Sequence, residues 1–413
     1  FFVASEAASQ ENLELFSKAV FQAIMPGLTS PSFRSYDELF SYIDNICSQE
    51  RIILAIDEFP YLAASYKAVS SLLQAHIDQK WKNSRLFLIL CGSSMSFMEH
   101  QVLGYKSPLY GRRTAQFKIH PFTFFESRRL LEGFSKEEQA IIYGITGGIP
   151  EYLSRIRPSI SLDENIIDLF FTESGRLYEE PSNLLKQELR DPSTYNSIIG
   201  AIASGASRLN DIAIKTGIET GAASNLLVSL IELGIVRKEI PVTEKAGSRK
   251  TIYLLQDQMF RFWYRFVAPN ISGIVRGIGA EIYEKQIRPQ LSHFMGFVFE
   301  EICQQYLYLP QNLSSAPFLY SKCGRWWGNN PVEKRQEEID IVVIDESHIL
   351  LGECKWQNAP VGIDVLKDLI LQGNLFYIQE KWFYVFAKTT FTKDCINYAE
   401  KSKNIRLITF DEM

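Results

Sequence analysis

Continuous apolar runs alternate with segments of helical periodicity in the first third of the chain. Runs that are apolar throughout are typical of strands buried on both faces, as in a parallel sheet covered by crossover helices. The pattern therefore predicts a parallel α/β domain. In chain order, its expected strands and helices are Phe1–Ala4, Asn12–Ile24, Ser35–Cys47, Arg51–Ile56, Lys67–Lys80 and Leu86–Cys91.

The pattern changes near residue 121 and again near residue 191. Residues 121–190 predict short helices that are broken at Gly147-Gly148 and Pro150, without strands. Three short helices and a hairpin follow, an order of elements that is typical of a winged helix-turn-helix. These elements are Tyr195–Ala203, Leu209–Thr216, Ala222–Leu233, Ile235–Ile240 and Thr251–Leu255.

Residues 291–413 return to an α/β pattern. The aromatic and basic segment Arg261–Arg265 precedes them and is expected to pack a connector. We expect a helix at 294–307, strands near 339–344, 349–354 and 382–387, and a helix at 364–377. The chain is therefore expected to hold several domains.

Composition and charge narrow the class of protein. The chain has 413 residues, 46% apolar and 22% charged, as is usual for a folded soluble protein. Its net charge of −5 excludes a globally basic nucleic-acid binder but not a local basic site. No apolar run approaches the ~20 residues that span a bilayer. The six cysteines form no Cys-x-x-Cys pair and the five histidines no His-x-x-x-His pair. We therefore expect a cytoplasmic protein without a membrane segment or a zinc site.

One apolar run ends in two carboxylates, Asp57 and Glu58. This order suits nucleotide hydrolysis, because the first carboxylate reaches Mg²⁺ and the second polarises the attacking water. The alternative is a buried strand that ends in a solvated acidic turn. The next apolar run ends in Gly92 followed by Ser93 and Ser94, where AAA-type ATPases carry a polar sensor. Further along, Tyr110-Gly111-Arg112-Arg113-Thr114 offers arginines that can meet a phosphate.

As a set, these segments resemble the prokaryotic AAA-related ATPase family first recognised in archaea, within the signal-transduction (STAND) ATPases. The resemblance covers Phe1 to about Phe266 and continues into the family's C-terminal domain. It implies ATP and Mg²⁺ as cofactors, held by Asp57, Glu58, Ser93, Ser94, Arg112 and Arg113, and self-association through the ATPase module. The segments that carry it are Phe1-Phe2-Val3-Ala4-Ser5-Glu6, Ile56-Asp57-Glu58-Phe59-Pro60-Tyr61, Leu90-Cys91-Gly92-Ser93-Ser94, Gly147-Gly148-Ile149-Pro150-Glu151-Tyr152-Leu153 and Phe262-Trp263-Tyr264-Arg265-Phe266.

One family motif is missing from the sequence. No Gly-x-x-x-x-Gly-Lys-[Ser/Thr] loop, the usual phosphate cradle, occurs in the 413 residues. In the family this loop precedes the segment that matches Phe1. Either the loop lies upstream of Phe1, which we favour, or nucleotide binding has been lost. The family fold places the strand before the loop between Leu86–Cys91 and a strand near Gln116–Ile119, so we expect those two strands to lie one strand-spacing too far apart.

A second set of charged residues lies in the C-terminal region. Asp340 begins an apolar strand, and Glu353 and Lys355 share one face of the next strand because residues i and i+2 point the same way. Two carboxylates can hold Mg²⁺, and a lysine can orient the water aimed at phosphorus. This arrangement resembles the Asp…Glu-x-Lys core of the restriction-endonuclease-like fold, and Glu300 completes it from a helix. The alternative is an α/β edge with incidental charges.

Evidence for DNA binding in the sequence is weaker. Residues 190–257 contain eight Lys/Arg and seven Asp/Glu, whereas duplex affinity rests largely on neutralised phosphates. The candidate recognition helix Ala222–Leu233 carries Ser224 and Asn225 but no Lys or Arg. The wing carries Lys245, Arg249 and Lys250, and Arg325-Trp326-Trp327 can stack on or grip nucleic acid, although packing is the favoured role.

The sequence thus predicts an α/β, multidomain protein that regulates a nuclease-like effector through ATP. Residues 1–122 form a parallel P-loop-type ATPase core, 123–190 a helical lid, 191–257 a winged helix-turn-helix that engages DNA, 258–290 a connector and 291–413 a PD-(D/E)xK nuclease-like domain. Its expected catalytic residues are Asp57, Glu58, Glu353 and Lys355, and its expected metal ligands are Asp57, Glu300, Asp340 and Glu353. Two alternatives remain: a regulatory ATPase with a structural C-terminal domain that binds a protein partner, and a DNA-binding protein without catalysis.

Overall fold

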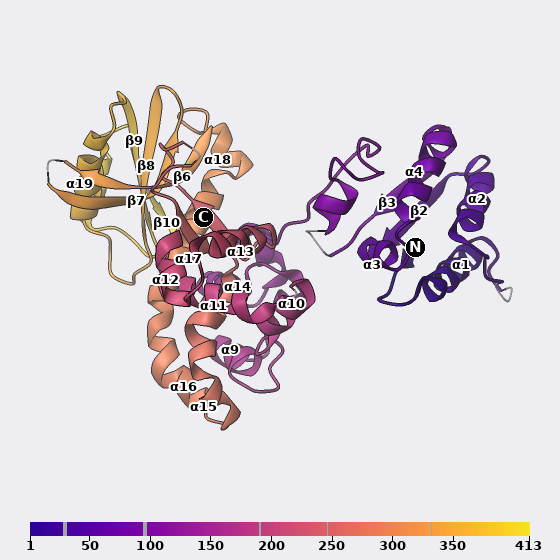
Figure 1. The fold of residues 1–413 in the computed structure, drawn as a ribbon. Coiled ribbons are helices and arrows are strands. Elements are labelled where there is room, and N and C mark those ends of the chain that lie inside the picture. Colours follow the sequence, from indigo (N-terminus) through magenta and orange to yellow (C-terminus); the bar gives the residue numbers. More distant parts are fainter. Residues whose placement is uncertain (28–30, 94–96, 190, 246, 332) are drawn as a thin grey trace. The chain divides into compact units, whose positions relative to one another are not determined.

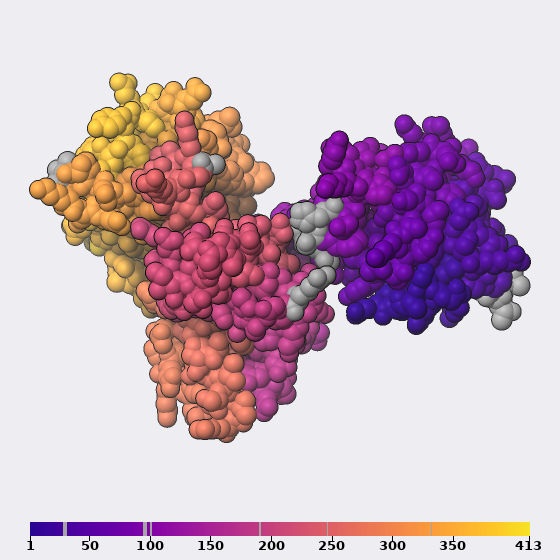
Figure 2. All heavy atoms as spheres, viewed as in Figure 1, coloured from indigo at the N-terminus to yellow at the C-terminus, as the bar shows by residue number. Residues whose placement is uncertain are grey.

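The computed structural model describes residues 1–27, 31–93, 97–189, 191–245, 247–331 and 333–413. The chain divides into two compact units, Phe1–Ile119 and His120–Met413 (Figures 1 and 2). No helix of the described residues is long and apolar enough to cross a membrane.

The first unit is built on a parallel three-stranded sheet in the order β1-β2-β3 (Figure 1). Phe2 pairs with Ile56, and Ile56 pairs with Leu90, so the strands are adjacent and parallel as the sequence predicts. The strands are β1 (Phe2–Val3), β2 (Ile52–Asp57) and β3 (Leu86–Leu90), and the helices are α1 (Ser9–Ile24), α2 (Tyr36–Cys47), α3 (Phe59–Ser65) and α4 (Val69–Gln79).

Only one face of this sheet is buried in the described residues. Side chains of β1 and β2 pack in one apolar cluster with α1, α2 and α4. The opposite face leaves four apolar side chains exposed: Val3, Ile53, Phe87 and Ile89. The expectation of burial on both faces is therefore not met, because no described element packs against these four residues.

The strand predicted near Gln116–Ile119 is also absent from the structure. Those residues have no assigned secondary structure, and the side chains of Phe117 and Ile119 are 84% and 88% exposed. An extended segment becomes a strand only when its backbone groups pair with a neighbour. Among the described strands β3 pairs with β2 alone, so the prediction of a strand here is wrong for this structure.

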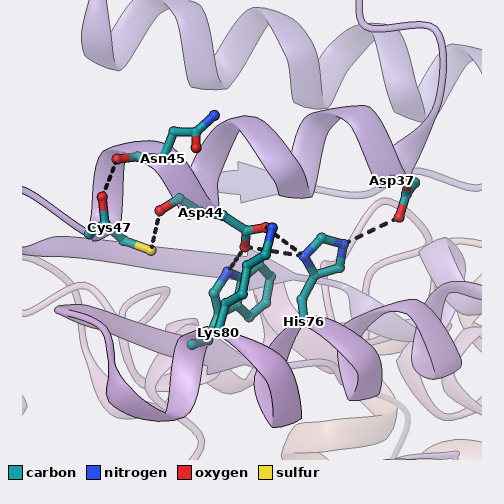
Figure 3. Close-up of polar contacts among 8 residues, drawn as sticks. Asp37, Asp44, Asn45, Cys47, His76 and Lys80 are labelled. Carbon is teal, nitrogen blue, oxygen red and sulfur yellow. Dashed lines mark hydrogen bonds and ion pairs between the residues drawn. The ribbon is translucent and has the colours of Figure 1, made fainter.

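A buried ionic cluster joins α2 to the end of α4. The Asp44 carboxylate accepts hydrogen bonds from Trp81 Nε1, from Lys80 Nζ at 2.8 Å and, at 3.0 Å, faces His76 Nδ1 (Figure 3). The other ring nitrogen of His76 faces Asp37 at 3.4 Å. The Asp44 side chain is only 3% exposed, so these partners, and not water, stabilise its buried carboxylate.

Replacing Asp44 with alanine is therefore expected to destabilise the first unit by about 3 kcal/mol or more, since the buried His76 and Trp81 and the half-exposed Lys80 all lose their shared partner. Urea unfolding, followed through hydrogen exchange of the α2 and α4 amides, measures this loss. Asn45→Ala is the matched control, because Asn45 lies next to Asp44 with an exposed side chain. Equal stability of the two variants would show that the cluster contributes nothing.

The second unit begins with helices, as predicted for residues 121–190. These are α6 (Phe124–Ser127), α7 (Lys136–Thr146), α8 (Pro150–Leu153), α9 (Leu162–Phe170) and α10 (Glu180–Glu188). The break between α7 and α8 requires glycine at Gly148, whose φ is +73° and whose added Cβ would lie 2.0 Å from the Phe122 carbonyl oxygen. Gly148 thus allows the backbone at Phe122 to pass close to the break between α7 and α8.

Three helices and an antiparallel hairpin follow. They are α11 (Pro192–Ala203), α12 (Leu209–Thr216), α13 (Thr220–Glu232), β4 (Val236–Glu239) and β5 (Ile252–Leu255). Val236 of β4 pairs with Leu255 of β5. The connector that leads on from the hairpin consists of α14 (Gln258–Phe262), helical turns over Trp263–Asn270, α15 (Ile271–Val275), α16 (Gly279–Ile282) and helical turns over Tyr283–Gln290.

A mixed five-stranded sheet in the order β10-β9-β8-β7-β6 forms the last part of the second unit. β6, β7 and β8 are antiparallel neighbours, and β8, β9 and β10 are parallel. Helix α17 packs on one face, and α19 and α20 pack on the other. The elements are α17 (Leu291–Leu307), α18 (Pro310–Ser314), β6 (Lys322–Asn330), β7 (Arg335–Ile344), β8 (His348–Lys355), α19 (Ile363–Gln372), β9 (Glu380–Ala387), α20 (Lys393–Ala399) and β10 (Ile405–Thr409).

Candidate functional site

The acidic pair of the first unit lies where β2 ends and α3 begins. Asp57 is the last residue of β2, and Glu58 has a left-handed backbone with φ of +50°. Such a conformation is uncommon outside glycine and marks a turn held by its surroundings. One Glu58 carboxylate oxygen accepts a hydrogen bond from Ser93 Oγ at 3.2 Å. The ends of β2 and β3 therefore bring together three polar residues that the sequence predicts for nucleotide chemistry.

Two features of the neighbouring chain shape this site. A Cβ on Gly92 would lie 2.4 Å from the Pro60 ring, so glycine allows the chain after β3 to pass close to α3. Burial, followed by the hydrogen bond to Asp57, raises the pKa of the Cys91 thiol to about 11. Cys91 thus remains a neutral thiol beside the acidic pair at neutral pH.

The arginines predicted to sense phosphate are placed elsewhere. Arg112 forms a two-pronged ion pair with Asp78 of α4, with contacts of 2.6 and 2.9 Å, and Arg113 donates to the Leu103 carbonyl at 3.4 Å. α4 leads into the start of β3. In a parallel sheet all strands start at the same end, so Arg112 is held near the end opposite to Asp57, which is the last residue of β2. No described contact joins either arginine to Asp57, Glu58 or Ser93. Ser94 lies outside the described residues.

These residues fit one half of a Mg²⁺–nucleotide site. Asp57 offers carboxylate oxygen, the ligand type that Mg²⁺ prefers, and Glu58 stands beside it with a hydroxyl partner. The other half, a glycine-rich loop whose N–H groups cradle phosphate, is missing from the sequence.

The predicted charged set of the second unit lies on β7, β8 and α17. Ile341 pairs with Gly352 in the antiparallel register, which places Asp340 opposite Glu353. Asp340 Oδ2 accepts the Cys354 N–H at 2.9 Å, and Lys355 Nζ lies 2.5 Å from Glu353 Oε1. Asp340, Glu353 and Lys355 therefore meet at one point of the sheet.

Glu300 approaches the same point from α17. Burial, followed by the charge of Asp340, raises the pKa of Glu300 to about 8 and that of Glu353 to about 7. Burial likewise raises the pKa of Asp340. Burial opposes the charge of Lys355, yet the adjacent Glu353 carboxylate raises the pKa of Lys355 above its usual value. The acids act on one another strongly because they are close together and poorly solvated.

Arg325, on β6, also lies among these acids, and we call Glu300, Asp340 and Glu353 the acid cluster. The Arg325 Nε atom lies 3.4 Å from Glu300 Oε2, and the guanidinium pairs with Glu338 on β7. The charge pattern of the sequence suggests that a metal ion or Lys355 alone compensates these acids, whereas in the structure Arg325 also pairs with two acids, Glu300 and Glu338. This pairing was not predicted because β6 was not predicted as a strand, so nothing placed Arg325 beside the acids. The neighbouring Trp326 is buried and packs edge-on against Phe376, in keeping with its favoured packing role.

The carboxylates of the acid cluster are the type of ligand that a divalent cation such as Mg²⁺ prefers. Glu300 Oε2 is buried and accepts no hydrogen bond, and Asp340 and Glu353 offer further carboxylate oxygens. Within the part of the chain that the structure describes, no three His, Cys, Asp or Glu side chains are grouped closely enough to hold a metal ion. The predicted ligand set of Glu300, Asp340 and Glu353 is therefore not assembled as a three-ligand site in this structure, and the residues left to hold Mg²⁺ are the opposed pair Asp340 and Glu353.

The residues proposed to touch DNA have mixed surroundings. Lys245 and Arg249 are exposed in the loop between β4 and β5, whereas Lys250 pairs with Glu244 at 2.8 Å. Asn225 of α13 is exposed. The free cations of this loop are thus fewer than its sequence suggests.

Comparison with known proteins gives two family matches and several relatives. A family described as an ATPase domain predominantly from Archaea matches residues 1–156, and a family of archaeal and bacterial proteins of unknown function matches residues 263–366. The uncharacterized protein MJECL04 of Methanocaldococcus jannaschii is 35% identical over 361 residues, covering 83% of this chain and 78% of that protein. Protein MJ0424 of the same organism is 37% identical over 57 residues, 14% of this chain and 55% of that protein.

Similarity to solved structures is low. The Orc1 protein of Aeropyrum pernix, solved in complex with DNA, has a TM-score of 0.29 and 14% identity, covering 65% of this chain and 76% of that one. Protein VC1899 of Vibrio cholerae has a TM-score of 0.23 and 11% identity, covering 92% of this chain and 79% of that one.

Proposed function

This chain belongs to one family with MJECL04, and its residues 1–156 match an ATPase domain found predominantly in Archaea. On that premise we propose that it is a regulatory ATPase coupled to a DNA-directed, Mg²⁺-dependent nuclease. The observation that carries the effector half of this proposal is the meeting of Asp340, Glu353 and Lys355 at one point of the C-terminal sheet.

In the ATPase half, Asp57 would hold the Mg²⁺ that accompanies ATP, and Glu58 would orient and polarise the attacking water. The metal supplies charge neutralisation on the phosphates. Ser93 holds the Glu58 carboxylate at 3.2 Å, which fixes the orientation of this base at the end of the sheet. Arg112 remains a proposed phosphate sensor only if its ion pair with Asp78 opens.

In the effector half, Asp340 and Glu353 would hold Mg²⁺, which supplies Lewis-acid activation of a phosphodiester. Lys355 stands beside Glu353, where its ammonium can orient a water molecule towards phosphorus. Glu300 adds negative charge behind the two ligands. The restriction-endonuclease-like assignment of this domain rests on these residues.

DNA engagement is assigned to the segment of three helices and a hairpin. Its order of elements supports a winged helix-turn-helix, with α13 as the recognition helix. Exposed Lys245 and Arg249 on the hairpin loop would contact phosphates, which position a protein on DNA without reading sequence.

A second candidate is a regulatory ATPase whose C-terminal domain is structural and binds a protein partner. The ion pairs of Arg325 favour it, because they neutralise Glu300 and Glu338 without any metal.

Plasmid nicking separates the two candidates. The full gene product is expected to nick supercoiled plasmid with Mg²⁺ and to lose this activity completely in EDTA, because both proposed ligands are carboxylates. Nucleotide binding by the same preparation is the control for folding. An intact ATPase that cleaves no DNA with Mg²⁺ or Mn²⁺ would favour the second candidate.

A further inference from the structure

The β4–β5 hairpin is docked on the edge of the C-terminal sheet. β6 is the last strand in the order of that sheet, and the Val242 N–H donates to the Arg325 carbonyl of β6 at 3.0 Å. The Val242 side chain packs against the apolar cluster that contains Trp326. The contact falls at the bulge of β6 between Gly324 and Trp326, where regular pairing with β7 is interrupted. The hairpin thus covers an edge that would otherwise expose unpaired backbone groups.

The same residue carries the charge that enters the acid cluster. The Arg325 side chain is 12% exposed, and its Nη1 lies 3.7 Å from Glu239 at the end of β4. On its other side Arg325 faces Glu300 and Glu338. Arg325 therefore links the hairpin to the acids through both its backbone and its side chain.

The junction around Arg325 is crowded with charge but incompletely hydrogen-bonded. The guanidiniums of Arg261, Arg237 and Arg325 lie 3.8, 4.9 and 5.6 Å from the centre of the Phe297 ring. Buried polar atoms without a hydrogen-bond partner include Arg325 Nε, Glu239 Oε2 and Glu300 Oε2. A buried network that is only partly satisfied gives little net stability. Val236, Tyr253 and Leu255 anchor the two strands of the hairpin in the apolar core, whereas the contacts of Glu239 and Val242 with Arg325 are modest, as a releasable contact requires.

We propose that the β4–β5 hairpin is a latch that keeps Arg325 in the acid cluster as an internal counter-ion, so that its release opens the cluster to a divalent cation. This inference rests on the proposed nuclease site and names its regulation. A guanidinium beside Glu300 and a divalent cation on Asp340 and Glu353 repel each other at such short range. Docking of the hairpin therefore weakens cation binding, and cation binding weakens docking of the hairpin.

Two pairs of variants of the full chain test the latch. Val242→Pro removes the N–H that reaches Arg325, whereas Val242→Ala trims the side chain but keeps that N–H. Glu239→Gln removes the charge that faces Arg325, whereas Glu244→Gln changes the same hairpin away from Arg325, where Glu244 pairs with Lys250. Hydrogen exchange of the Cys323–Trp327 amides, without metal, measures release of the hairpin. Mn²⁺ titration by electron paramagnetic resonance measures cation affinity.

Val242→Pro and Glu239→Gln are expected to speed that exchange and to tighten Mn²⁺ binding by about tenfold or more, the effect of withdrawing a nearby cation. Glu244→Gln should bind Mn²⁺ as the wild type does, and Val242→Ala, which keeps the N–H but loses apolar contact, should tighten Mn²⁺ binding less than Val242→Pro does. Faster exchange with unchanged Mn²⁺ affinity in both test variants would overturn the latch.

Arg325→Gln separates failure of the latch from failure of the proposed nuclease site. This variant removes the internal counter-ion and should bind Mn²⁺ more tightly, whereas Arg325→Lys, which keeps the charge, should not. Tight binding by Arg325→Gln without any gain in the hairpin variants refutes the latch alone. If Arg325→Gln folds, as judged by its thermal unfolding, and binds no Mn²⁺, the metal site itself is refuted and the latch with it.

Discussion

Glu58→Gln is expected to preserve ATP binding and to slow hydrolysis by about 100-fold or more, because the attacking water loses its polarising base. Asp57→Ala should instead weaken binding of the Mg²⁺–nucleotide complex. Both are measured on the full gene product, by nucleotide binding and by phosphate release. Glutamine keeps the size of the side chain and can still accept the hydrogen bond from Ser93, so the turn at Glu58 should survive.

The control for this experiment is Glu50→Gln. Glu50 is exposed and lies just before β2, at the opposite end of the strand from Glu58. Glu50→Gln therefore makes the same change of side chain and charge at a position away from Asp57 and Glu58. Hydrolysis by Glu58→Gln at the rate of Glu50→Gln would remove Glu58 from the mechanism.

The strands of the first unit were predictable because each is a continuous apolar run. The same property misled about coverage, because it implied burial on both faces, whereas Ile53 and Phe87 are exposed. The strand expected near Gln116–Ile119 followed from the family fold and not from an apolar run, and it forms no pairing. An apolar run reports the tendency to be buried, whereas actual burial depends on which other elements are present to cover it.

Residues brought together by register and packing were harder to foresee. Asp340, Glu353 and Lys355 follow from strand periodicity, so their meeting was predictable. The role of Arg325 was not, because the glycine and asparagine residues of β6 weaken its strand signal and a bulge sets its direction. The Asp44–His76 cluster was missed because its residues lie on separate helices, although Asp44 does sit among the buried positions of α2.

The Arg112–Asp78 pair illustrates the same limit. A sequence can say that an arginine lies in the expected part of the chain, but not which acid it meets. Here the bidentate pair holds Arg112 on α4. Motif spacing thus located the carboxylates at the strand ends, where the backbone fixes direction, better than the arginines, which lie in the irregular segment after β3.

Asp340→Ala and Lys355→Ala are each expected to abolish Mg²⁺-dependent DNA cleavage without unfolding the domain. The first removes a proposed metal ligand, and the second removes the ammonium that lies 2.5 Å from Glu353. Asp340 also accepts the Cys354 N–H, so its truncation leaves a buried donor unpaired at a cost of about 1–3 kcal/mol. Asp340→Asn avoids that cost, since the amide oxygen can still accept this hydrogen bond.

Activity of Asp340→Asn is therefore the decisive measurement. Loss of cleavage in this variant, with thermal unfolding close to that of the wild type, assigns the loss to the missing charge and not to instability. Asp364→Ala is the matched control, because Asp364 is exposed at the start of α19. This variant should cleave DNA as the wild type does. Wild-type cleavage by Asp340→Asn, with the same dependence on Mg²⁺, would place the metal elsewhere. The Glu300–Arg325 ion pair would then be the better account of why these acids are gathered, as a structural cluster neutralised by the protein's own cations.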